Sequence, residues 1–126
     1  MSTTRINPYS YAPGANITGE ATATISARKF VKISGNRTAA GNLAVAPAAA
    51  GDRAFGVAAH DAATGQLVHV ARGGVVKVLA SGAIAAGAAV QVGAGGAAST
   101  AAAGVVVGFA VTGAADGAVA EVAFYA

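Results

Sequence analysis

Two stretches of the sequence follow the same pattern and decide the fold. The first is Gly56-Val-Ala-Ala-His-Asp-Ala-Ala-Thr-Gly-Gln-Leu-Val-His-Val70, and the second is Gly108-Phe-Ala-Val-Thr-Gly-Ala-Ala-Asp-Gly-Ala-Val-Ala-Glu-Val122. They align without gaps, and each has a glycine-led apolar run, a turn ending in Thr-Gly or Asp-Gly, and a second run ending in valine. A glycine in such a turn supplies the positive φ of a tight β-hairpin. Each stretch therefore predicts a hairpin, and the pair predicts an internal duplication.

The similarity continues upstream of both hairpins. Val31-Lys32-Ile33 aligns with Val76-Lys77-Val78, and the turn Ala39-Ala40-Gly41 aligns with Ala85-Ala86-Gly87. Each half then has the order strand, turn, short strand, loop, glycine-led strand and hairpin. Two such halves can pair their edges into one closed or nearly closed sheet.

The spacing of apolar runs predicts the architecture of the whole body. From residue 28 onward, short β-branched runs alternate with glycine-rich turns about every 8–12 residues. We expect an all-β body over 28–126, a small barrel or sandwich of about eight short strands in two similar halves at about 28–74 and 75–126. The alanine-rich segments 46–50 and 97–103 lack an amphipathic stripe and are predicted to be loops or a single turn. The predicted strands are 29–34, 43–46, 54–59, 67–71, 75–80, 88–92, 105–111 and 119–125.

Residues 1–27 differ from the body. They are rich in Ser, Thr and Asn, contain Pro8 and Pro13, and sustain neither a helical nor a strand period. This composition predicts an extended N-terminal arm over 1–27 that becomes ordered only when something holds it. The basic character is also N-terminal, because residues 1–37 hold five Lys or Arg against one Glu, whereas 38–126 hold three against four acidic residues.

The composition excludes several classes of function. The chain has no cysteine, which excludes disulfide scaffolds, zinc fingers and thiol catalysis. Only 10% of residues are charged and the body is near neutral, so no basic face for nucleic acid is expected. No window of about 20 uninterrupted apolar residues indicates a membrane span. With 37 alanines and 18 glycines the core is built from small side chains, so we expect modest stability and association with partners.

Catalytic and metal-binding residues are sparse. His60 and His69 are the best candidates for a metal site, because a hairpin through Gly65 brings them onto adjacent strands beside Asp61. No third ligand is evident, and two polar positions on the outer face of a hairpin are the preferred interpretation. The five carboxylates are scattered, and nothing places two of them in one cleft. We therefore expect no enzyme activity, no metal, no cofactor and no small-molecule substrate.

Lys77 offers an alternative from another class of protein. A lysine on a hairpin in a duplicated β-fold of small residues resembles the swinging-arm carrier domains that bear biotin or lipoate. Those domains place the lysine at a tight exposed turn, whereas Lys77 lies between Val76 and Val78 in a predicted strand. An outward-facing strand position is the preferred interpretation.

Over most of residues 20–126 the chain resembles the phage head decoration, or capsid cement, proteins. The resemblance is carried by FVKISGNRTAAGN at 30–42, AFGVAAHDAATGQLVHVARGGVVKVLASGAIAAGAAVQVG at 54–93 and GVVVGFAVTGAADGAVAEVAFY at 104–125. It implies a structural β-protein on the outer surface of a phage capsid, bound as a homotrimer at three-fold or quasi-three-fold sites between capsomers.

The same resemblance implies a role for the arm, which would lie over neighbouring subunits of the major capsid protein. Bound trimers would stabilise the shell by mass action, since they bind the assembled lattice and not its free subunit. The expected capsid contacts are apolar or aromatic anchors in the arm and basic residues after it: Ile6, Tyr9, Tyr11, Ile17, Arg28, Lys29 and Lys32. Another virion β-protein, such as a tail-tube or fibre-base subunit, is the alternative.

Overall fold

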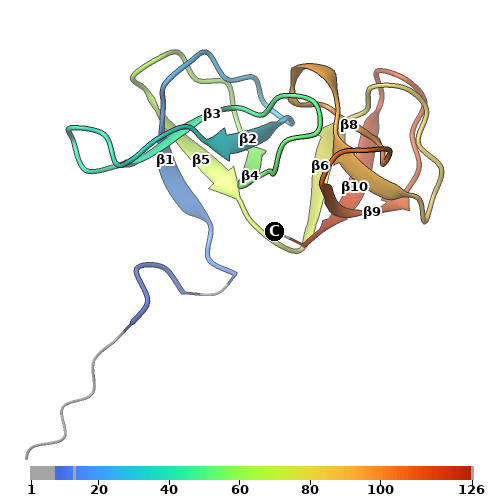
Figure 1. Cartoon of the computed structure of the whole chain (residues 1–126), viewed down its shortest axis with the longest axis horizontal. Coiled ribbons are helices and arrows are strands. Elements are labelled where there is room, and N and C mark those ends of the chain that lie inside the picture. The colour runs from blue at the N-terminus through green and yellow to red at the C-terminus, as the bar shows by residue number, and fades with distance from the viewer. Residues whose placement is uncertain (1–7, 13, 126) are drawn as a thin grey trace, which may run out of the picture.

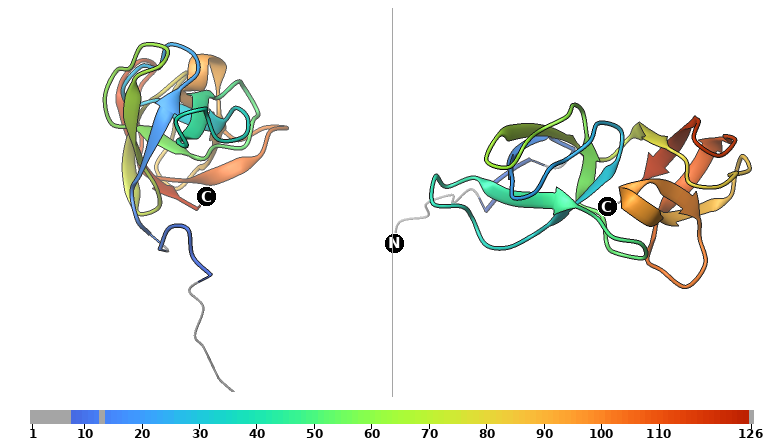
Figure 2. Two further views of the ribbon diagram at one scale, coloured as in Figure 1. Left: turned by 90° about the vertical axis from the view of Figure 1, so that its left-hand side faces the viewer. Right: turned by 90° about the horizontal axis from the view of Figure 1, so that it is seen from above.

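The computed structural model of the chain describes residues 8–12 and 14–125. Within these residues the protein has ten β-strands and one short 3-10 helix, arranged as two sheets that lie side by side along the long axis (Figures 1 and 2). The all-β prediction is confirmed, and a strand lies in each of the eight segments where one was expected.

The first sheet closes on itself, and we call it the N-terminal barrel. Its spatial order is β1-β3-β2-β4-β5, and antiparallel pairing of β1 with β5 closes the ring. Only the β1–β3 pair is parallel. Val31, Val45, Val68 and Val70 fill the interior and are at most 1% exposed. The strands are β1 (Ile17–Ala21), β2 (Phe30–Ile33), β3 (Leu43–Pro47), β4 (Gly56–Ala58) and β5 (Leu67–Ala71).

The second sheet, which we call the C-terminal sheet, has the order β6-β10-β9-β7-β8. An isolated parallel bridge between Ala80 and Ala98 brings its two edge strands together, so the sheet curls almost into a second barrel. Its elements are β6 (Val75–Leu79), β7 (Ala89–Val92), the 3-10 helix η1 (Ala94–Gly96), β8 (Ala98–Thr100), β9 (Val106–Thr112) and β10 (Val119–Phe124).

The two sheets repeat one five-stranded unit. The pairs β1–β5, β2–β3, β2–β4 and β4–β5 correspond to β6–β10, β7–β8, β7–β9 and β9–β10. The registers also correspond. Val31 lies opposite Gly56 in the barrel, and Val90 lies opposite Gly108 in the sheet. The duplication predicted from the two hairpins is therefore present in the fold. The expectation that the two halves pair their edges into one closed sheet is wrong, because each half forms a sheet of its own.

The structure corrects the upstream part of the sequence alignment. Because β2 corresponds to β7, Val31-Lys32-Ile33 is matched by Val90-Gln91-Val92, and not by Val76-Lys77-Val78. Gly87 then corresponds to Arg28, and both have a left-handed backbone, with φ of 82° and 61°. In a chain so rich in alanine and glycine, short matches arise by chance and misplaced this part of the repeat.

The first unit also begins earlier than predicted. Ile17–Ala21 forms β1, and Ile25 bridges to Ala62, so the second half of the segment expected to be an arm belongs to the barrel. The run Ile-Thr-Gly-Glu-Ala holds one large apolar side chain and therefore gives little strand signal. β8 was missed for the same reason, since it lies within the alanine-rich segment 97–103 predicted as a loop.

One apolar core joins the two sheets. Phe30 and Val57 point out of the N-terminal barrel and pack among the buried side chains of the C-terminal sheet. The ring of Phe30, which is fully buried, stacks on Phe124 with centroids 5.8 Å apart. Main-chain hydrogen bonds cross the same boundary, including one from the Leu79 N–H to the Arg28 carbonyl at 2.9 Å. The two units therefore form a single folded body.

Candidate interaction surface

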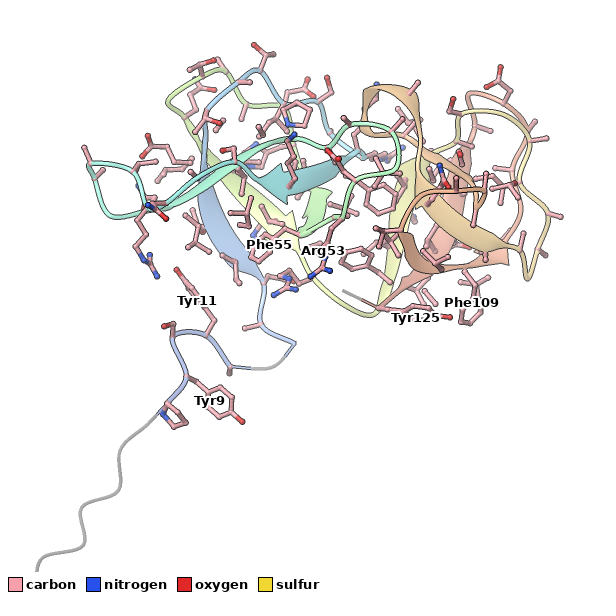
Figure 3. The ribbon with its side chains drawn as sticks, in the orientation of Figure 1. Tyr9, Tyr11, Arg53, Phe55, Phe109 and Tyr125 are labelled. Atoms are coloured by element: carbon pink, nitrogen blue, oxygen red, sulfur yellow. The ribbon has the colours of Figure 1, made fainter. Side chains whose placement is uncertain are left out.

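A groove of about 740 Å³ lies at the end of the N-terminal barrel where the N-terminal segment leaves it. Tyr9, Tyr11, Phe55 and Tyr125, which line it, lie along one side of the molecule in Figure 3. We call this hollow the barrel-end groove. The body contributes to its wall Ile17, Ile33, Leu43, Phe55, Arg72 and Tyr125.

Arg72 is held in place against Phe55 in this wall. Its Nε donates a 2.8 Å hydrogen bond to the Phe55 carbonyl, and its guanidinium carbon lies 4.2 Å from the Phe55 ring centroid. The Arg72 N–H also donates to the Asn16 side-chain oxygen at 3.4 Å. A fixed guanidinium beside apolar side chains can stack on an aromatic ring or pair with a carboxylate of a partner.

The N-terminal segment is tied to the barrel through Tyr11. The Tyr11 hydroxyl accepts a hydrogen bond from Arg37 Nη1 at 3.4 Å, and the guanidinium lies 5.9 Å from the ring centroid. Arg37 is itself fixed by a 2.8 Å bond to the Gly41 carbonyl. Residues 8–12 lie outside the two sheets, beside the end of the N-terminal barrel (Figure 1). Tyr9 and Tyr11 are 59% and 40% exposed.

The other predicted anchors behave differently. Ile17 is 4% exposed in β1, where its side chain completes the barrel end, so it supports the fold and offers little surface to a partner. This corrects the placement of Ile17 in the arm, on which its prediction as an anchor rested. Ile6 lies outside the described residues.

The three basic residues predicted as capsid contacts lie in different surroundings. Arg28 is an exposed turn residue whose carbonyl accepts the hydrogen bond from Leu79 between the sheets. Lys29 is half-buried. Lys32 Nζ forms an ion pair with Asp52 Oδ2 at 3.3 Å across the loop that follows β3. Lys32 therefore has a structural partner, and Arg28 is the most exposed of the three.

Asp52 organises that loop. Its Oδ2 also accepts the Ala49 N–H at 2.9 Å, and the hydrogen bonds from Ala49 and Lys32 hold the pKa of Asp52 below its ordinary value. Gln91, the residue of β7 equivalent to Lys32, fixes the equivalent loop after β8. Its Oε1 accepts the N–H groups of Ala102 and Gly104 at 2.8 and 2.9 Å.

The C-terminal sheet carries an exposed surface that the sequence analysis did not single out. Four outward-facing apolar residues lie side by side across β6, β10, β9 and β7, and we call them the apolar row: Val75, Ala123, Phe109 and Ala89. Val75 is 60% and Phe109 is 38% exposed. Tyr125 extends the row, with its ring centroid 6.1 Å from that of Phe109 (Figure 3). The sequence signal was the presence of apolar residues in both phases of β9 and β10, which indicates a sheet covered on both faces.

The histidine pair meets through the backbone. His60 Nε2 accepts the His69 N–H at 3.2 Å, so only one of the two rings takes part in this contact. Asp61 accepts the Ala27 N–H at 2.7 Å and thereby holds the hairpin loop against the chain that precedes β2. In residues 8–12 and 14–125 no group of three or more His, Cys, Asp or Glu side chains is placed to hold a metal ion.

Lys77 lies in the middle of β6 opposite Glu121 and is exposed, as the outward-facing interpretation predicts. It is therefore not at the turn where a carrier lysine sits. Across the described part of the chain, no helix has the length and apolar character needed to cross a membrane.

Two tandem five-stranded units, an N-terminal segment with exposed tyrosines and an exposed apolar row define a structural module suited to contacts with other proteins. Residues 11–125 match the family model of the phage cement proteins, and the chain belongs to this family. The resemblance identified from the sequence is confirmed. The protein is accordingly a structural component of the phage virion, on the outer surface of the capsid.

The fold is similar to a solved structure described as the crystal structure of head fiber gp8.5 N base in bacteriophage phi29. The TM-score is 0.74 at 22% sequence identity, and the match covers 88% of this chain and 93% of that chain. At this identity the likeness shows that the fold is shared. No curated protein matches the sequence.

Proposed function

We propose that the protein binds the major capsid protein as a homotrimer, at three-fold or quasi-three-fold sites of the capsid, and stabilises the assembled shell. The observation that carries the proposal is the N-terminal segment. It is fixed to the barrel by the contact between Tyr11 and Arg37, and Tyr9, which comes before this contact in the chain, is exposed. A tethered segment of this kind is suited to contact a neighbouring subunit.

Three such segments in one trimer bind together. Once one is engaged, the others meet their sites at high effective concentration, so weak contacts combine into strong attachment by factors of roughly 10² or more. Exposed tyrosines are effective anchors, because they bury a large area with little loss of side-chain freedom. Attachment to the assembled lattice alone then stabilises the head.

The test is co-sedimentation with empty heads that lack the protein. Full-length protein, a chain lacking residues 2–12, and the double variant Tyr9→Ala, Tyr11→Ala are compared, with Leu67→Ala as control, because Leu67 is similarly exposed on the barrel. We expect saturable pelleting of the full-length and control chains and binding at least about tenfold weaker for the other two. Equal pelleting of all four would remove the N-terminal segment from the mechanism, and no pelleting of any would contradict capsid binding.

The fold shared with the N base of a head fiber supports a second function, as the base of a projecting structure on the head. Electron microscopy of decorated heads separates the two. Compact density at the three-fold positions supports the cement function, whereas a projection at a few sites on each head supports a fibre base.

A further inference from the structure

The outward face of the N-terminal barrel is covered within the chain. Phe30, Val57 and Ala71 lie side by side across β2, β4 and β5. They belong to the core shared with the C-terminal sheet, whereas Val31, Ala58 and Val70, their chain neighbours, fill the barrel interior. This face is apolar because the C-terminal sheet packs on it.

The same face of the C-terminal sheet is exposed. By register, Phe30, Val57 and Ala71 correspond to three members of the apolar row, Ala89, Phe109 and Ala123. Phe109 corresponds to Val57, which is 4% exposed, yet Phe109 is 38% exposed. A sheet face that is apolar in both units but covered in only one indicates that the second is covered in an assembly.

The surface that covers the first face is the end of the C-terminal sheet. Phe124 and Val76 lie there, at 5% and 7% exposed, and Phe124 stacks on Phe30. The equivalent end of the N-terminal barrel carries Arg72 in place of Phe124 and Ile17 in place of Val76. This end is the barrel-end groove.

We propose that the apolar row of one copy packs into the barrel-end groove of a second copy. This contact repeats, between chains, the packing of an outward sheet face on the end of the other unit that joins the two units within a chain. The inference rests on the proposed trimer and assigns its interface. Phe109 enters beside Ile33, which is 46% exposed at the groove, and its ring meets the guanidinium of Arg72. That pairing replaces the stacking of Phe30 on Phe124 with a cation–π contact.

The contact is head to tail, because it joins two different surfaces of the same chain. Such interfaces generate rings when the rotation closes. Phe109 and Tyr125 lie along the lower side of the C-terminal sheet in Figure 3, and Phe55 lies near the point where the N-terminal segment leaves the barrel. Because the apolar row and the barrel-end groove lie on one side of the chain, three copies can bring these surfaces together around a three-fold axis. The three N-terminal segments then lie on one side of the trimer.

The first test uses two variants and their mixture, measured by light scattering after size exclusion. Wild type and the control Leu67→Glu are expected at about three times the chain mass of 11.9 kDa. Phe109→Glu and Ile33→Glu are each expected to be monomers. Both side chains are exposed in the single chain, so circular dichroism should show an unchanged fold.

Mixing the two variants gives the decisive readout. The Ile33→Glu chain keeps an intact apolar row, and the Phe109→Glu chain keeps an intact groove, so a mixture restores one interface and forms dimers that cannot close. Trimers in either single variant, monomers in wild type, or no dimer in the mixture would overturn the proposal. Retention of the trimer by Ile33→Glu alone would indicate that another surface, such as the N-terminal segment of a neighbour, covers the row.

A second test exploits the absence of cysteine from the chain. Phe109→Cys and Ile33→Cys together are expected to give covalently linked trimers with a short bis-maleimide, and either substitution alone is expected to give none. Cross-linked dimers from either single variant would indicate a symmetric contact and overturn the head-to-tail arrangement. Head co-sedimentation is run in parallel. Trimers that form as described but do not bind heads contradict the proposed function and leave this interface intact.

Discussion

The two five-stranded units share a topology and a register, but they bury opposite surfaces. In the N-terminal barrel the outward face is buried and the end is an open groove. In the C-terminal sheet the end is filled and the outward face is exposed. When a repeated unit packs its outward face on the end of the next unit, one outward face and one end stay uncovered, as in other repeat proteins. Duplication has thus built one interface inside the chain and left the two halves of a second at its surface.

The substitutions between the units fit this division. The end that is filled within the chain carries Phe124, whereas the open end carries Arg72, which remains compatible with water. The covered face carries Phe30 where the exposed face has Ala89, and the exposed face carries Phe109 where the covered face has Val57. Each face therefore holds one aromatic ring, as expected if the exposed face also packs in an assembly.

The largest expected effect comes from breaking the covered interface. Phe30→Ala removes a fully buried ring stacked on Phe124 and is expected to lower the free energy of unfolding by about 3–5 kcal/mol. Phe109→Ala, at the equivalent face of the other unit, is expected to cost less than about 1 kcal/mol. Urea unfolding is measured in the Ile33→Glu background, so that assembly does not add to stability.

The milder Phe30→Leu keeps the comparison measurable if Phe30→Ala does not fold. It too should destabilise more than Phe109→Leu. Equal losses at the two positions would show that the faces are buried alike in the single chain, contrary to the structure.

A second prediction tests the repeat itself at its matched glycines. A Cβ on Gly56 would meet the side chain of Val70 and the carbonyl of Ala71, and one on Gly108 would meet the carbonyl of Ala123. Gly56→Ala and Gly108→Ala should each lower the free energy of unfolding by about 2 kcal/mol or more, because the obstacle is backbone of the paired strand. A tolerated alanine at one of the two would mean that the units are not packed alike. Gly35→Ala, where a Cβ would meet nothing, is the matched control.

Much of this architecture could be predicted from the sequence. The hairpins were evident because glycine-led apolar runs and turn glycines mark both ends of each, and eight strands followed from the spacing. β1 and β8 were not evident, since strands made of Ala, Gly, Ser and Thr carry almost no pattern of large apolar residues. Their burial arises from long-range pairing, with β3 and β5 for β1 and with β7 for β8.

The candidate surface was predicted only in part. Tyr9 and Tyr11 were predicted as contact residues because packing within a polar segment does not explain the presence of two aromatic rings. Phe55, Arg72 and Phe109 were missed because they lie in or beside strands, where an apolar or long side chain is normally read as core. The sequence does not show which face of each sheet is covered by the other unit, because that depends on how the two units pack together.

A third comparison concerns the equivalent residues Lys32 and Gln91, which tie the loops after β3 and β8. Gln91→Ala leaves the N–H groups of Ala102 and Gly104 without their acceptor and is expected to cost about 1–2 kcal/mol. Lys32→Ala removes a half-exposed ion pair and is expected to cost about 0.5 kcal/mol. Thermal unfolding of both variants checks the order. A larger loss for Lys32→Ala would indicate that charge, and not backbone satisfaction, stabilises these loops.

The smallest expected effect is a difference in pH dependence between the loop fixed by Asp52 and the loop fixed by Gln91. Hydrogen bonds from Ala49 and Lys32 lower the pKa of Asp52 below its ordinary value of 3.8, so the contribution of this carboxylate is present above that pH and is lost as the pH falls through its lowered pKa. The difference in Tm between wild type and Asp52→Asn should therefore be constant from about pH 5 to 7 and shrink below pH 4. Gln91 carries no charge, so the difference between wild type and Gln91→Ala should stay constant over the same range. A difference for Asp52→Asn that persists down to pH 2 would mean that the neutral acid holds the Ala49 N–H as well as the carboxylate does, and that the two loops are stabilised by the same uncharged contact.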